Sequence, residues 1–170
     1  MAKKPENITD DENIGDVPQA PLIIHKQYLK DMSFESPNSP EMLKPATNRP
    51  EMDMNIMLDI QKLKHPKHEY FYEVTLTLTT SAKREGKTLF LAEIIYGATA
   101  SIQGLEEKQH HPILFIEVPQ LMFPFARQIM AHATQSGGFT ALHLSPVDFR
   151  AMYLKRFAEQ RAQNKEQKEA

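Results

Sequence analysis

The feature that most restricts the fold is a two-residue alternation in residues 68–81, HEYFYEVTLTLTTS. Large apolar side chains occupy one row and polar side chains the other: Tyr72, Val74, Leu76 and Leu78 against Glu73, Thr75, Thr77 and Thr79. Because successive side chains of a β-strand point to opposite faces, this pattern predicts a strand with one buried and one solvated face. Threonine on the solvated face is typical of an antiparallel sheet.

The neighbouring segments also alternate and predict further strands. Residues 51–61 place Met52, Met54, Ile56, Leu58 and Ile60 in one row. Residues 82–87, AKREGK, predict a charged hairpin turn at Gly86, and residues 88–104 are extended again. Within that last segment, Gly97 predicts a bulge or a break that begins a fourth strand.

The hydrophobic period then changes from two residues to that of an α-helix. Between residues 119 and 138 the apolar positions follow helical spacing: Met122, Phe125, Ala126, Ile129 and Ala133. Gly137 is placed to end this helix, and Pro124 lies in its first turn or at a kink.

A second helix is predicted to begin at Ser145, with Ser145 as N-cap, Pro146 in the first turn and Asp148 near the positive helix end. Its apolar stripe contains Phe149, Met152, Tyr153 and Phe157. Strands followed by helices predict an α+β fold: a four-stranded antiparallel sheet packed against a long helix, with a second, C-terminal helix.

The composition limits the classes of protein to which the chain can belong. The 170 residues suit one domain, and the net charge of −2 gives no reason to expect a nucleic-acid partner. The absence of cysteine excludes disulfides, and neither a signal peptide nor an apolar run of about 20 residues is present. We therefore expect a cytoplasmic protein with a disordered segment 1–21, one domain at 22–157 and a polar tail at 158–170.

Catalytic and metal-binding patterns are weak. His65 and His68, and the pair His110 and His111, could bind a metal, but no carboxylate accompanies them at helical spacing. The serines lie in a proline-rich stretch without a nucleophile elbow: Ser33, Ser36 and Ser39. Glu106 and Glu107 are more typical of a solvated turn than of an acid and base pair.

The strand predicted at 88–96 is apolar on both sides. Leu89, Leu91, Glu93 and Ile95 form one row, and Phe90, Ala92, Ile94 and Tyr96 form the other. Either both sides are covered within the chain, or one side meets a partner. Glu93 favours the partner, because a lone buried carboxylate is destabilising by several kcal/mol.

Four separated segments resemble, in order, the SecB-type protein-export chaperones of bacteria: QYLKDMSFESPNSP (27–40), TLFLAEIIYG (88–97), LMFPFARQ (121–128) and GGFTALHLSPVDF (137–149). The resemblance covers residues 22–157. It implies a cytoplasmic homotetramer, a dimer of dimers with sheets outside and long helices between. Such a chaperone holds unfolded precursor proteins without ATP or a cofactor and delivers them to the SecA ATPase, without nucleic acid or direct insertion into a membrane.

The resemblance also assigns roles to residues. An acidic surface with a leucine, which docks the zinc-containing C-terminal segment of SecA, matches Asp31, Glu35, Leu91 and Glu93. The subunit interior or interface matches Phe90, Ala92, Ile94, Met122, Phe125 and Ile129. The client groove matches Met42, Leu43, Met52, Met54 and Ile56, although the loop EMLKPATNRP lacks the tryptophan of well-known members. Two alternatives stay open: a small-ligand-binding protein that shares only the fold, and a hydrolase that uses His and Glu.

Overall fold

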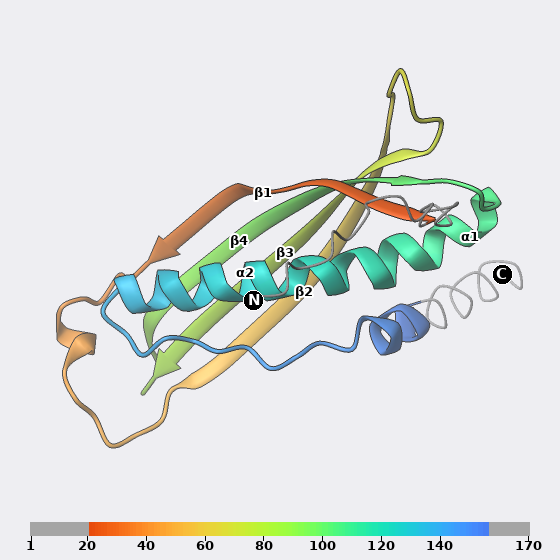
Figure 1. Cartoon of the computed structure of the whole chain (residues 1–170). Helices are drawn as coiled ribbons and strands as arrows, with labels where there is room; N and C mark the ends of the chain where they lie inside the picture. Colours follow the sequence, from red (N-terminus) through yellow and green to blue (C-terminus); the bar gives the residue numbers. More distant parts are fainter. Residues whose placement is uncertain (1–20, 157–170) are drawn as a thin grey trace, which may run out of the picture.

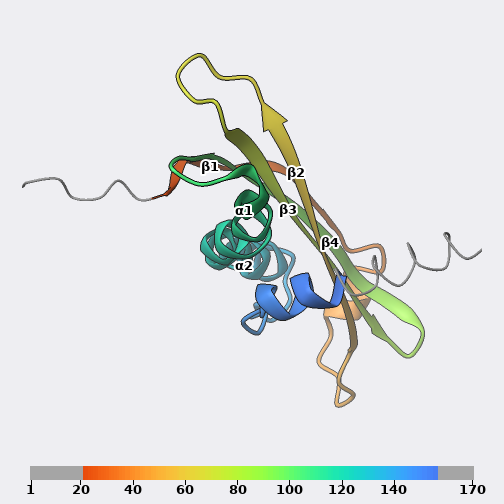
Figure 2. The ribbon, with the colours of Figure 1, turned by 90° about the vertical axis from the view of Figure 1, so that its right-hand side faces the viewer.

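A computed structural model of the chain describes residues 21–156 and contains one antiparallel sheet. Its strand order is β1-β4-β3-β2, with β1 at Leu22–Glu35, β2 at Glu51–Leu63, β3 at Phe71–Arg84 and β4 at Lys87–Ile102. All helices lie on one side of this sheet (Figures 1 and 2). The predicted α+β class is confirmed.

The two faces of the sheet differ in burial. We call the face that the helices cover the inner face and the opposite one the outer face. The inner row of β3 is buried and its outer row is half-exposed, as the alternation predicted. On β4 the inner row is also buried, and it contains Phe90, Ala92 and Ile94. The strands β3 and β4 meet in the predicted hairpin turn, where Glu85 and Gly86 both have positive φ.

Strand β1 was not predicted, and the break expected in residues 88–104 does not exist. Two register shifts interrupt the pairing of β1 with β4, between Ile24 and Lys26 and between Leu29 and Asp31. Each shift adds one residue, so the inner row passes from even to odd positions and back. The alternation that would have identified this strand is therefore hidden in the sequence.

Gly97 lies inside a continuous β4 and serves a close approach instead of a break. Its partner across the ladder is Tyr28. A Cβ atom at position 97 would lie 2.7 Å from Cε2 of the Tyr28 ring. The missing side chain lets this ring cross β4, so that the Tyr28 hydroxyl donates a hydrogen bond to Glu73 on β3.

The long helical segment begins earlier than predicted. It consists of α1 (Glu107–Pro112), a π-helical turn η2 (Ile113–Glu117) and α2 (Val118–Ser136). Glu106 is its N-cap, in a capping box with Gln109. The prolines at 112 and 119 and the wider π turn between them interrupt the helical period, which explains why the sequence pattern predicted a start near residue 119. As predicted, the helix ends before Gly137.

The face of α2 that contacts the sheet is rotated relative to the predicted stripe. Met122, Ala126 and Met130 are fully buried. Phe125, which was predicted to belong to the subunit interior or to an interface, is 49 % exposed in the single chain, and Ile129 is half-buried. Positions four residues apart line one side of a helix, so a row through 122, 126 and 130 leaves Phe125 at its margin.

The C-terminal helix comprises residues 149–156 of the described chain. Its N-cap is Asp148, whose Oδ1 accepts a hydrogen bond from the Ala151 N–H at 2.8 Å, so the prediction of Ser145 as N-cap was wrong. Phe149 is buried against Phe123. Phe157, the polar tail and the predicted disordered segment up to residue 20 lie outside the described residues. Within residues 21–156 no helix is long and apolar enough to cross a membrane.

Candidate functional site

The four residues expected to form an acidic surface lie together on the outer face. The pairing of β1 with β4 places Glu35 opposite Leu91, Ser33 opposite Glu93 and Asp31 opposite Ile95. Directly opposed residues in an antiparallel pair share one face of the sheet. We call Asp31, Glu35, Leu91 and Glu93 the acidic patch.

The acidic patch is accessible to a partner. Leu91 is 41 % exposed, and Asp31 and Glu35 are exposed beside it. Glu93 is half-buried and accepts a hydrogen bond of 3.2 Å from the Thr79 hydroxyl on β3. Three carboxylates surrounding an exposed leucine give a surface suited to a basic partner that also has an apolar group.

The proline-rich turn after β1 holds the end of the patch in place. Pro37 has no N–H and cannot continue the ladder. Instead, the Ser36 hydroxyl donates to the Leu89 carbonyl at 3.0 Å, and the Asn38 amide donates to the Thr88 carbonyl at 2.9 Å. These side chains replace backbone donors at the start of β4 and so keep Glu35 next to Leu91.

Glu73, another carboxylate on the outer face, is in a different environment. Lys30 Nζ lies 3.0 Å from Glu73 Oε2, and the Tyr28 hydroxyl also donates to this carboxylate. The hydrogen bond from Tyr28, together with Lys30, lowers the pKa of Glu73 despite its burial. Burial and then the bond to Glu73 raise the pKa of Tyr28 to about 12. Glu73 is thus engaged within the sheet and is not available to a partner.

An apolar groove of about 680 Å³ separates β1 from α2. Its lining includes Leu29, Met32 and Phe34 from β1, Tyr96 from β4, and Phe125 and Ile129 from α2. Leu29 and Met32 are exposed in the single chain. The sequence did not reveal these two residues as part of a surface, because β1 itself was hidden by its register shifts.

The residues expected to bind clients are divided between two places. Met42 packs against the core, and Leu43 lies near Gly138 beyond the end of α2. Met52 and Met54 are exposed on the inner row of β2. Farther along the inner row of β2, a second groove of about 500 Å³ lies between this strand and the C-terminal helix. Its lining includes Ile56, Leu58, Phe115, Phe149 and Met152.

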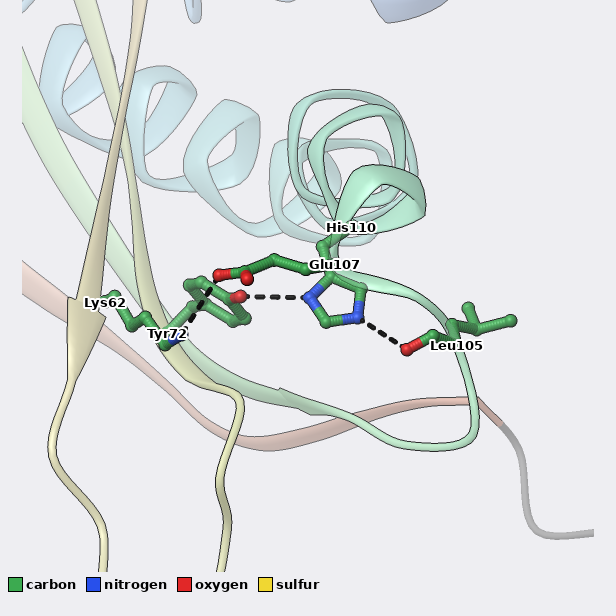
Figure 3. Close-up of polar contacts among 5 residues, drawn as sticks. All are labelled: Lys62, Tyr72, Leu105, Glu107 and His110. Carbon is green, nitrogen blue, oxygen red and sulfur yellow. Dashed lines mark hydrogen bonds and ion pairs between the residues drawn. The ribbon is translucent and has the colours of Figure 1, made fainter.

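His110 is part of a buried polar network at the start of the long helical segment (Figure 3). Its Nε2 donates to the Leu105 carbonyl at 3.2 Å, so Nδ1 accepts from the Tyr72 hydroxyl at 3.0 Å. Beside it, Lys62 Nζ lies 3.1 Å from Glu107 Oε1. Both ring nitrogens have partners within the protein, so this histidine connects helix and sheet rather than binding a metal.

The other histidine pair stacks on aromatic rings. The rings of His65 and His68 are 4.7 Å apart, and His65 stacks on Phe71 at 4.5 Å. His25 lies 4.9 Å from His68, and burial followed by these two neighbours lowers the pKa of His25. Within residues 21–156 no three His, Asp or Glu side chains are arranged to hold a metal ion.

Comparison with known proteins agrees with this architecture. The family model described as preprotein translocase subunit SecB matches residues 16–160. The protein-export protein SecB of Rhodospirillum rubrum is 46 % identical over 138 residues, covering 81 % of this chain and 83 % of that protein. The corresponding protein of Chelativorans sp. is 41 % identical over 170 residues, covering 98 % and 99 %.

A solved structure shares the fold. It is the SecB-like chaperone of Mycobacterium tuberculosis, in complex with a peptide from an antitoxin, with a TM-score of 0.58 and 11 % identity over 74 % of this chain and 87 % of that one. The family model matches most of the chain, and the relatives are more than 40 % identical over most of their length. The chain therefore belongs to the SecB family.

Proposed function

We propose that this chain is a cytoplasmic, ATP-independent chaperone of protein export. It holds unfolded precursor proteins in a translocation-competent state and delivers them to the SecA ATPase. The observation that carries this proposal is membership of the SecB family over residues 16–160, combined with apolar surfaces that the single chain leaves open. A chaperone that holds clients needs such surfaces, because unfolded chains expose apolar segments.

Client binding is supported by the kind of side chains that are exposed. Of the large apolar residues exposed within residues 21–156, four are methionines: Met32, Met52, Met54 and Met57. Methionine is flexible and polarisable, so it can contact many different sequences. We assign Met52, Met54 and Ile56 of β2, with Met42 and Leu43 of the preceding loop, to the client groove.

Assembly into a homotetramer, a dimer of dimers, would cover the apolar surface between β1 and α2. The exposed side chains Leu29, Met32, Leu121 and Phe125 all lie on these two elements. A second copy packed against them removes this area from water, which stabilises the assembly. We assign Phe125 and Ile129 to an interface between copies, and a light-scattering mass near that of one chain would contradict this assignment.

The acidic patch is the proposed docking site for the zinc-containing C-terminal segment of SecA. Its carboxylates attract a basic segment, and Leu91 adds apolar contact area. Because these charges are exposed, salt should screen the attraction. We expect the affinity for this segment to fall roughly tenfold between 50 mM and 500 mM salt. An affinity that is independent of salt would contradict an electrostatic docking site.

Refolding kinetics test the holding function directly. The chain is mixed at near-stoichiometric ratio with a slowly folding precursor, and the return of native fluorescence is followed without ATP. We expect a marked delay, shortened in the double variant Met52→Glu and Met54→Glu and unchanged in Glu93→Lys, which alters the outer face of β4 instead. A small-ligand-binding protein predicts no delay at all, and a hydrolase predicts turnover that a single histidine replacement abolishes.

A further inference from the structure

The three carboxylates of the acidic patch are held to different degrees. Glu93 accepts a hydrogen bond of 3.2 Å at its Oε2 from the Thr79 hydroxyl on β3. Within residues 21–156, the side chains of Asp31 and Glu35 have neither a hydrogen bond nor an ion pair. Glu93 is also half-buried, whereas these two acids are exposed. The carboxylate on β4 is therefore the one whose position the sheet itself fixes.

The strand pairing explains why Thr79 reaches Glu93. The two residues are directly opposite each other in the ladder of β3 and β4. Side chains opposed in this way on one face have Cβ atoms about 5 Å apart. Threonine is branched at Cβ and has few favourable χ1 rotamers, so its hydroxyl loses little freedom when it forms the bond. Thr79 thus offers Glu93 a donor that is already in place.

The other two acids show why the direction of Glu93 matters. Asp31 is opposite Ile95 and Glu35 is opposite Leu91, so both are diagonal neighbours of Glu93 on β1. Diagonal neighbours lie roughly 7–8 Å apart, and like charges at this distance repel each other. The bond to Thr79 holds Glu93 toward β3, on the side away from both acids. A space between the three carboxylates is thereby left for a cationic group of a partner.

The hydroxyl orients Glu93 without neutralising it. Within the described part of the chain, no lysine, arginine or histidine forms an ion pair with Glu93. Glu73 differs, because Lys30 lies 3.0 Å from its carboxylate and offsets its charge. Two carboxylates of the same face are thus both held in place, but the charge of Glu93 stays available to a partner.

We propose that Thr79 is a positioning residue of the acidic patch: its hydroxyl holds Glu93 in the orientation that binds a cationic side chain of the SecA segment. This inference rests on the proposed docking function and identifies a residue outside the patch that prepares it. A side chain that is ordered before binding loses less conformational entropy when the partner arrives. Thr79 therefore raises the affinity through Glu93 and not through a contact of its own.

Two substitutions at position 79 separate the hydroxyl from the shape of the side chain. Thr79→Val keeps the branched shape and removes the donor, and Thr79→Ser keeps the donor and removes a methyl group. Calorimetric titration at low salt with the zinc-containing C-terminal segment of SecA should show binding about fivefold weaker in Thr79→Val and within about twofold of the unmodified chain in Thr79→Ser. Unchanged affinity in Thr79→Val, or equal weakening in both variants, would overturn the proposal.

Thr77 provides a matched control on the same strand. It lies in the same outer row of β3, but its partner across the ladder is Ile95, which has no hydrogen-bond acceptor in its side chain. Thr77→Val makes the same chemical change and should leave the affinity within about twofold. A loss as large as that in Thr79→Val would assign the effect to the polarity of the face in general, which would overturn the proposal.

A double-variant cycle tests whether Thr79 acts through Glu93. In a Glu93→Ala background no carboxylate remains to be oriented, so Thr79→Val should change the affinity by less than about twofold. A fivefold loss in this background as well would mean that Thr79 contacts the partner directly, and it would overturn the positioning role. Thr79→Ala also removes the hydroxyl and should show the same loss, so it tests the proposal even if Thr79→Val fails to fold.

The unmodified chain separates this inference from the function on which it rests. If it does not bind the SecA segment, the proposed docking site fails, and the role of Thr79 fails with it. If it binds the segment and Thr79→Val binds equally well, the docking site stands and only the positioning role is overturned.

Discussion

The two faces of β4 are similar in hydrophobicity but differ in their environment. The inner row of Phe90, Ala92 and Ile94 is sealed under α2, whereas Leu91, Glu93 and Ile95 stay accessible on the outer face. An apolar row is therefore not sufficient to identify a core. The acid between two apolar residues marks the open side, because a carboxylate without a charged partner is tolerated only where water or a binding partner reaches it.

The largest expected effect comes from replacing one residue of each row by alanine. Ile94 is fully buried, so Ile94→Ala should lower the free energy of unfolding by about 3 kcal/mol through lost burial and a cavity. Leu91→Ala should lower it by less than about 1 kcal/mol. Urea unfolding at a fixed protein concentration measures both. Similar losses would show that the outer row is also covered.

Gly97 lies on the outer face of β4, where the Tyr28 side chain crosses the strand. A Cβ atom at this position would meet the Tyr28 ring, so Gly97→Ala should destabilise the protein by about 1–2 kcal/mol. The matched control is the same substitution in a Tyr28→Ala background, where the ring is absent and the loss should disappear. A loss of the same size in both backgrounds would assign it to the backbone instead.

A smaller effect on stability is expected at Glu73, the carboxylate of the outer face that is paired within the sheet. Its folded-state pKa is lowered, so the stability that it contributes is present above its unfolded pKa and is lost as pH falls through the folded one. Glu73→Gln should therefore weaken the dependence of the melting temperature on pH in the acid range. An acid-range profile identical to that of the unmodified chain would refute the pairing.

The contact between Tyr28 and Glu73 can also be tested at alkaline pH, where the Tyr28 phenol ionises. Its pKa is raised to about 12, so its stabilising contribution is present below pH 10 and is lost as pH rises through about 12. The difference in absorbance at alkaline pH between the unmodified chain and Tyr28→Phe should show one phenol that ionises near pH 12. Ionisation of that phenol near pH 10 would mean that Tyr28 is neither buried nor hydrogen-bonded to Glu73 as described.

The regular parts of this fold were predictable from the sequence, and the irregular parts were not. The rows of β3 and the turn at Gly86 follow from alternation and turn chemistry. β1 was missed because its two register shifts change the phase of its alternation. The start of the long helix at Glu107 was missed because prolines and a π turn disturb the period.

The candidate site was only partly predictable for the same reason. The residues of the acidic patch were expected from a resemblance, but the contact between Glu35 and Leu91 depends on strand pairing that periodicity does not specify. Leu29 and Met32 could not be recognised as a surface without that pairing. Whether Phe125 faces the sheet or the surface could not be predicted, because helical spacing defines a stripe but not its rotation toward the sheet.

We propose that the inner face of β4 stabilises the fold, while its outer face docks a partner. Calorimetric titration at low salt with the zinc-containing C-terminal segment of SecA tests this claim most directly. Glu93→Lys should weaken binding about thirtyfold, while Asp59→Lys, the same change of charge on the outer face of β2, should stay within about threefold. Unchanged affinity in Glu93→Lys, or equal weakening in both variants, would contradict the account.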